Sequence, residues 1–219
     1  MTTKTFSFLL VGLFLTTILF MGCKEDNNDP PDETSGTYTD SRDGKTYQWK
    51  KIGDQVWMTE NLAFLTANCW AYDNNDANTG LYGYLYTWDA ALVAVPEGWH
   101  VATDSEWKEL QKFLGLSQMD ADEVGWQGKE GKKLKSNTAW NDNGGGTDEV
   151  GFKAMPGGYY LGGGSFGLMG TSGMWWTATE DTEYSTSYAW LRQMSANNDA
   201  IYRGHNDKAY GYSVRCVRD

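Results

Sequence analysis

The sequence ATDSEWKELQKFLG, residues 102–115, predicts a helix with a defined beginning and end. Thr103 can accept a hydrogen bond from the amide of Glu106 while the Glu106 side chain reaches back to the amide of Thr103, which forms a capping box. Gly115 favours the left-handed conformation that ends a helix. The acids at 104 and 106 suit the positive end of the helix dipole and need no catalytic role. Between cap and stop lies one apolar stripe, formed by Trp107, Leu110 and Leu114.

On the N-terminal side of this helix, a hairpin and a second helix are expected. The β-rich stretches 46–52 (TYQWKKI) and 55–58 (QVWM) are separated by Gly53-Asp54, which predicts a two-residue turn. In residues 85–95, apolar side chains recur at helical spacing until the stretch Pro96-Glu97-Gly98 stops the pattern.

On the C-terminal side, a glycine-rich segment precedes a set of strands. Residues 144–173 contain 12 glycines, but no lysine and hydroxyl residue complete a phosphate-binding loop there. Trp175-Trp176 begins a strand, and residues 188–194, 201–203 and 210–218 predict a meander. Early helices, hairpins at both ends and an irregular middle together predict an α+β fold in one domain.

Composition and charge exclude several functions. The 219 residues include 18 basic and 29 acidic side chains, a net charge of −11, which opposes binding to nucleic acid. Two histidines cannot form a three-histidine metal site, and three cysteines leave little material for redox chemistry. We therefore expect no cofactor and no metal.

Residues 1–22 have the features of a secretory signal. Lys4 supplies a positive charge, and an apolar run too short for a membrane-spanning helix follows it. The run ends in Gly22-Cys23, which resembles a bacterial lipobox, so Cys23 is expected to carry the lipid. The alternative is an ordinary secretory signal followed by an incidental cysteine.

The residues after Cys23 indicate where the protein is displayed. Lys24, Glu25 and Asp26 resemble the export signal of Bacteroidota lipoproteins, which implies an outer-membrane lipoprotein facing the cell exterior. The alternative is a merely solvated tether, because the polar segment that follows lacks apolar residues. We place the lipidated cysteine and flexible tether at residues 23–36 and the domain at residues 37–219.

Six separate motifs lie along the domain: QVWMTENL at 55–62, YDNN at 72–75, LYTW at 85–88, PEGWH at 96–100, GFKAMPGG at 151–158 and SVRCVR at 213–218. Taken in order, they resemble one family, the Fibrobacter succinogenes major paralogous domain. That family comprises secreted or lipid-anchored bacterial proteins.

A more distant resemblance extends to the sulfatase-modifying (formylglycine-generating) enzymes and the C-type-lectin-like folds. It rests on the helix start at 102–107 and on the C-terminal stretch 211–218. The resemblance implies a C-type-lectin-like domain with two helices, a small antiparallel sheet and long glycine-rich loops. The enzymes bind copper through a reactive cysteine pair near the C-terminus, where this chain has only Cys216, so that chemistry should be absent.

With Cys23 lipidated, Cys69 and Cys216 are the remaining thiols. In an oxidising compartment they can pair as a disulfide. Alternatively they stay free and pack as small hydrophobes, since the family resemblance places the partner of Cys216 where this chain has Val95. A nucleophilic cysteine would need a nearby base such as His100, which lies in a structural motif.

Exposed aromatic rings are the remaining functional lead. Two or three of the aromatic residues around Trp126, Trp140, Tyr159 and Tyr160 are expected on a loop face, where a sugar ring could stack on them. The competing interpretation places most of these aromatic residues in the core. We expect a non-catalytic binding or adhesion domain for a polysaccharide or a surface protein, tethered to the membrane by its lipid. The alternative is an enzyme related to the sulfatase modifiers with a reassigned site.

Overall fold

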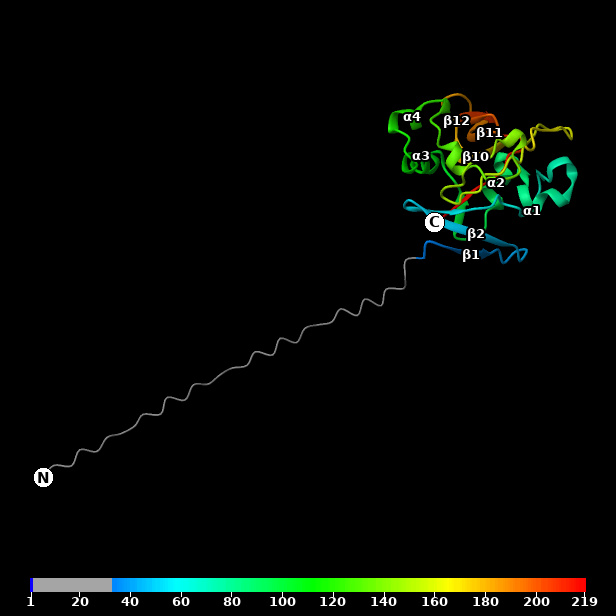
Figure 1. Ribbon diagram of the computed structural model, residues 1–219. Coiled ribbons are helices and arrows are strands. Elements are labelled where there is room, and N and C mark those ends of the chain that lie inside the picture. The colour runs from blue at the N-terminus through cyan, green and yellow to red at the C-terminus, as the bar shows by residue number, and fades with distance from the viewer. Residues whose placement is uncertain (2–32) are drawn as a thin grey trace. The chain divides into compact units, whose positions relative to one another are not determined.

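The computed structural model describes residue 1 and residues 33–219, and Figure 1 shows their arrangement. The signal at residues 1–22, the lipidation of Cys23 and the export residues Lys24, Glu25 and Asp26 lie outside the described residues, apart from residue 1. Residues Glu33–Asp219 form one compact unit.

The first sheet has five antiparallel strands in the order β1-β2-β3-β13-β6. The predicted hairpin is confirmed, because Ile52 pairs with Gln55 across the turn. Strand β1 begins at Ser35, which pairs with Lys50, so the last two residues assigned to the tether belong to this sheet. Its strands are β1 (Ser35–Thr39), β2 (Thr46–Ile52), β3 (Gln55–Met58), β6 (Trp99–Val101) and β13 (Cys216–Arg218).

The second sheet has four strands in the order β10-β11-β12-β7. The predicted meander is confirmed for β11 and β12, but the expectation that residues 210–218 continue it is wrong. The chain leaves this sheet after Asp207, and β13 inserts between β3 and β6 of the first sheet. The strands are β7 (Gly125–Gln127), β10 (Ser172–Glu180), β11 (Tyr188–Ser195) and β12 (Asn198–Asp207).

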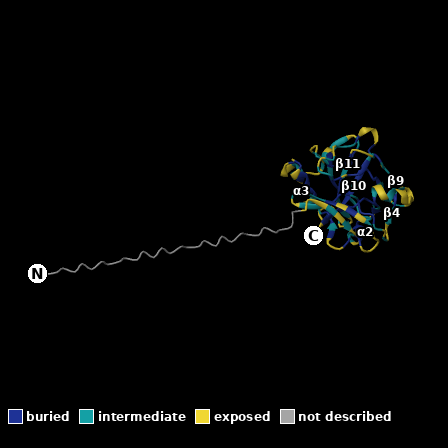
Figure 2. Cartoon of the chain, turned by 60° about the horizontal axis from the view of Figure 1, so that its bottom comes forward, coloured by how far each residue is buried: buried dark blue, intermediate teal, exposed yellow. Residues whose placement is uncertain are grey.

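Two hydrophobic clusters cover opposite faces of strand β10. Because side chains alternate along a strand, Trp175 packs into one cluster and its neighbour Trp176 into the other. The same alternation sends Cys216 and Val217 of β13 to different clusters. Figure 2 shows the buried residues gathered in the interior of the domain, with exposed segments at its rim.

Helix α2 contributes buried side chains to one of these clusters, and helix α3 contributes to the other. Helix α3 (Asp104–Phe113) carries the predicted capping box, and Trp107 packs edge-on against Trp57 at 5.2 Å. Gly115, with φ of +117°, follows the end of the helix as expected. Figure 1 shows α3 and α2 on opposite sides of β10.

Helix α2 (Trp88–Ala94) is shorter than the expected helix at 85–95. Thr87 is its N-cap and accepts a hydrogen bond from the Ala90 amide, so the helix cannot begin earlier. The two preceding residues form strand β5 (Leu85–Tyr86) instead, which pairs with β4 (Cys69–Trp70).

The remaining elements are short. They are α1 (Thr79–Tyr82), α4 (Gln118–Asp122), α5 (Gly131–Leu134), β8 (Tyr159–Tyr160), β9 (Phe166–Gly167) and 3-10 turns at Tyr72–Asn74, Asp76–Asn78 and Asn141–Asn143. The fold is thus a mixture of small antiparallel sheets and a few short helices. No helix within the described part of the chain is both long and apolar enough to cross a bilayer.

Candidate functional site

Aromatic side chains surround a hollow of about 240 Å³ beside the loop that joins β10 to β11. We call it the His205 hollow; its lining residues are Asp181, Glu183, Tyr184, Trp190 and His205. The register of β11 and β12 places Trp190 directly opposite His205. Tyr184 comes from the loop at residues 181–187, so three segments build this site.

The ring of His205 lies at the centre of the aromatic group. Tyr184 stacks on it with ring centroids 4.4 Å apart, and Tyr188 meets it edge-on at 5.6 Å. Trp190 lies at 5.6 Å with a tilt of 51°. Tyr184 remains 65% exposed despite this stacking, so its ring is offered to solvent. The hollow therefore presents aromatic surface that the fold already holds in place.

Asp181 holds the loop and the imidazole together. Its side chain is buried, one carboxylate oxygen pairs with His205 Nδ1, and the other accepts a hydrogen bond from the Tyr184 amide at 3.2 Å. The Asp181 amide donates to the carbonyl of Tyr188 at 3.0 Å. Within residues 33–219, His205 Nε2 has no hydrogen-bond partner, which leaves it able to bond to a ligand.

A buried ionic cluster supports the hollow from behind. The guanidinium of Arg203 lies 3.7 Å from the centroid of the Trp190 ring and bonds to Asp104 at 2.9 Å. Asp104 also accepts a 2.7 Å bond from Arg192. Burial alone raises the pKa of Asp104, but the hydrogen bonds and charges of the two arginines outweigh it and lower the pKa to about 2.

A second hollow, of about 310 Å³, lies where the QVWMTENL and GFKAMPGG motifs meet. Arg215 lies buried beside it, donating to Asn61 Oδ1 at 2.8 Å and to the carbonyls of Phe152 at 2.6 Å and Lys153 at 2.7 Å. Burial lowers the pKa of Arg215 to about 9. The lining is mostly polar and holds no aromatic ring: Thr59, Glu60, Gly80, Leu81, Ser136, Asn137, Thr138, Asp148, Lys153 and Met155.

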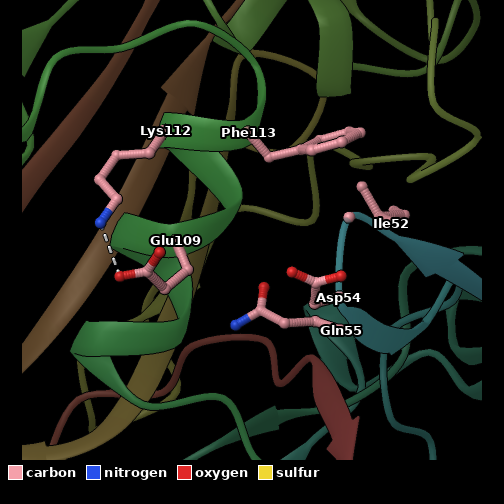
Figure 3. A pocket seen from close by; sticks show the side chains of 7 residues that line it. Ile52, Asp54, Gln55, Glu109, Lys112 and Phe113 are labelled. Atoms are coloured by element: carbon pink, nitrogen blue, oxygen red, sulfur yellow. Dashed lines mark hydrogen bonds and ion pairs between the residues drawn. The ribbon is translucent and has the colours of Figure 1, made fainter.

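A third hollow, of about 390 Å³, separates the β2–β3 turn from helix α3 (Figure 3). Glu109 and Lys112 on α3 form an ion pair with each other at 2.8 Å. Gln55 accepts a bond from Trp57 at 3.1 Å. Phe113 is the single aromatic ring of this lining, which makes the hollow a weaker candidate than the His205 hollow, where Tyr184 and Trp190 gather around the imidazole.

The four aromatic candidates for ligand binding do not form one surface. Trp126 is 40% exposed on β7 and packs against Tyr202. Tyr159 is half-buried on β8. The other two are buried: Trp140 is 7% exposed and donates to the Ala154 carbonyl, and Tyr160 is 8% exposed and stacks on Trp70 at 3.9 Å.

The structure also distinguishes the alternatives for the cysteines. Cys69 and Cys216 are free thiols, so the disulfide is not formed. Cys69 donates to the Thr66 carbonyl at 3.1 Å, and Cys216 is buried in the core, where burial raises its pKa to about 12. Both thiols have the packing role that was the alternative to a disulfide.

His100 does not face Cys216. In the β6–β13 pair, His100 lies opposite Val217, and Cys216 lies opposite Val101, so the two side chains point to opposite faces of the sheet. His100 instead bridges Glu106 at 2.7 Å and Asp219 at 2.6 Å. The hydrogen bonds that the imidazole donates to these carboxylates, the one to Glu106 above all, raise the pKa of His100 to about 9.

The residues of the His205 hollow were missed by sequence reasoning. The sequence feature that could have predicted this site is the turn at residues 197–199, because a hairpin with that turn places Trp190 near the residues around 203–205. The pairing has a register shift between Gln193 and Ser195, however, and such an irregularity is not visible in the sequence. Among residues 33–219, no group of three or more His, Cys, Asp or Glu side chains is arranged to hold a metal ion.

These features define a small mixed α/β domain with pre-formed surface hollows. Residues 51–218 match the model of the Fibrobacter succinogenes major domain, and the chain belongs to that family. Comparison with curated proteins and with solved structures found no match.

Proposed function

We propose that this protein is a lipoprotein of the outer-membrane surface whose domain binds a glycan without catalysing a reaction. Cys23 would carry the lipid, and Lys24, Glu25 and Asp26 would direct export to the cell exterior. The C-type-lectin-like relationship of the domain is part of this proposal and is supported by the sequence resemblance. Binding of a surface protein at the same site is the competing outcome.

The observation that carries the proposal is the exposed ring of Tyr184 in the His205 hollow. Its stacking on His205 and the neighbouring Trp190 give a rigid aromatic surface, on which the C–H face of a sugar ring can pack. His205 Nε2 and the carboxylate of Glu183 lie at the same hollow, where they can bond to sugar hydroxyl groups. A shallow hollow of this kind suits a unit within a polymer chain.

We infer a non-catalytic domain because Cys216 is not suited to act as a nucleophile. Cys216 is buried with a raised pKa, which opposes the thiolate form that a nucleophile needs. His100, the base that could have activated it, lies on the other face of the sheet.

A polysaccharide array followed by isothermal titration calorimetry tests glycan binding. We expect Tyr184→Ala to weaken binding at least about tenfold, equivalent to about 1.4 kcal/mol. Phe113→Ala is the matched control, because Phe113 is also an exposed ring (57%) but lies on α3 beside a different hollow. Equal affinity of Tyr184→Ala and the unchanged protein would reject the His205 hollow as the site.

Two cellular experiments test the anchor and the display. Palmitate labelling should disappear in Cys23→Ala, and labelling that persists would reject lipidation at that residue. Protease treatment of intact cells should remove the domain if it faces outward, whereas protection from protease would place it in the periplasm.

A further inference from the structure

We infer that the His205 hollow recognises an amino sugar with a free ammonium group rather than a neutral or acidic sugar. This inference rests on the proposed glycan binding and concerns the same hollow. It follows from the charges around the aromatic rings, which leave one carboxylate unpaired.

The basic side chains near the hollow are bonded to carboxylates of the chain, and none of them is exposed in its lining. His205 pairs with the buried carboxylate of Asp181. Arg203, which lies against Trp190, is buried and shares the carboxylate of Asp104 with Arg192. Lys208 pairs with Glu180 and also donates to the Thr186 carbonyl at 2.7 Å.

Glu183 is the exception among the charged lining residues. It is exposed, and none of residues 33–219 provides a hydrogen bond or ion pair to its carboxylate. The charged group that the lining exposes to a ligand is therefore a carboxylate. An acidic sugar would meet repulsion here, while a neutral sugar would gain nothing from this carboxylate beyond a hydrogen bond.

The aromatic rings favour the same ligand. The face of a tyrosine or tryptophan ring carries a negative partial charge and attracts a cation placed over it. Tyr184 offers such a face next to Glu183, so an ammonium group could contact a ring and a carboxylate at once. An amino sugar combines that cation with a C–H face that can stack.

Calorimetry with two oligosaccharides of equal length tests the inference on the purified full-length protein. The probes are a glucosamine oligomer and its N-acetylated counterpart, compared at low ionic strength and below the pKa of the amine. We expect the glucosamine oligomer to bind about tenfold more tightly, because acetylation removes the charge and leaves the ring.

Three variants connect the preference to the hollow. Glu183→Gln should bring the affinity for the amine close to that for the acetylated oligomer, while Tyr184→Ala should weaken both. Glu97→Gln, which removes another exposed carboxylate, should keep the preference. A preference that survives Glu183→Gln would show general attraction to an acidic protein and would overturn the inference.

The remaining outcomes separate the inference from the proposed function. Equal binding of both oligomers, lost in Tyr184→Ala, would overturn the amino-sugar preference and leave glycan binding in place. Absence of binding by both oligomers would also overturn the preference, even if another glycan binds in a Tyr184-dependent way. If no glycan on the array binds through Tyr184, the proposed function fails as well.

Discussion

Asp104 and Arg215 lie at the centres of two buried polar clusters that handle charge in different ways. Around Asp104, one carboxylate serves two arginines, Arg192 and Arg203, with bonds of 2.7 and 2.9 Å. Around Arg215, the hydrogen-bond acceptors are an amide oxygen, Asn61 Oδ1, and backbone carbonyls of three residues, those of Met58, Phe152 and Lys153. The first cluster is ionic, and the second surrounds a cation with neutral oxygens.

The difference shows what each cluster does for the fold. The Asp104 cluster joins the start of helix α3 to strands β11 and β12, so it positions the sheet that carries the His205 hollow. The Arg215 cluster joins the last segment of the chain to the residues after β3 and to the glycine-rich loop. Removing the central residue should therefore leave buried charges in one case and mainly unpaired oxygens in the other.

The largest effect is expected from Asp104→Ala. It leaves Arg192 and Arg203 buried without their carboxylate, which should reduce the free energy of unfolding by about 3–5 kcal/mol. Urea unfolding measures the loss, and Asp104→Asn serves if the alanine variant does not fold. Glu109→Ala, which removes an exposed carboxylate paired with Lys112, should leave the midpoint nearly unchanged. A small loss in Asp104→Ala would contradict the ionic role of this cluster.

A smaller loss is expected from Arg215→Met. Methionine fills much of the space and removes the buried charge, but it leaves the carbonyls of Met58, Phe152 and Lys153 without their donor. We expect a reduction of about 2 kcal/mol in the same urea experiment. Lys129→Met is the control, because Lys129 is exposed. A loss as large as that of Asp104→Ala would show that the two clusters are energetically equivalent.

The smallest effect is an acid dependence that only the Asp104 cluster should show. Its folded pKa of about 2 lies below the ordinary value of 3.8, so the unfolded chain takes up the proton first as the pH falls. The stabilisation is present above pH 3.8 and is lost as the pH decreases to about 2. The stability difference between the unchanged protein and Asp104→Asn should therefore shrink over that range. The corresponding difference for Arg215→Met should stay constant, and a parallel decrease there would contradict the assignment to Asp104.

The parts of the fold that were predictable depend on residues close together in the chain. The capping box of α3 and the Gly53-Asp54 turn need only a few neighbouring residues, and both are confirmed. Helix α2 was placed correctly but given too many residues, because apolar spacing alone did not reveal that Thr87 is its cap. Motifs that form local hydrogen bonds thus predicted helix α3 and the turn correctly, whereas hydrophobic periodicity did not predict where helix α2 begins and ends.

The candidate site was not predictable in the same way. Trp140 and Tyr160 were among the candidates for the ligand-binding surface but are buried. Tyr184 is exposed and stacks on His205, 21 positions further along the chain, through the β11–β12 pairing. Whether an aromatic residue is core or surface depends on what packs over it, and that partner is usually distant in sequence.

The sequence by itself determined the family, the capped helix α3 and the first hairpin, because each depends on short motifs or contacts between near neighbours. Only the tertiary structure decided that β13 crosses into the first sheet, that both thiols stay free and that a histidine lies within an aromatic hollow. Those outcomes depend on strand register, a local shift in pairing and long-range burial. Each of these depends on many contacts between residues that are far apart in the sequence, so no single stretch of residues determines it.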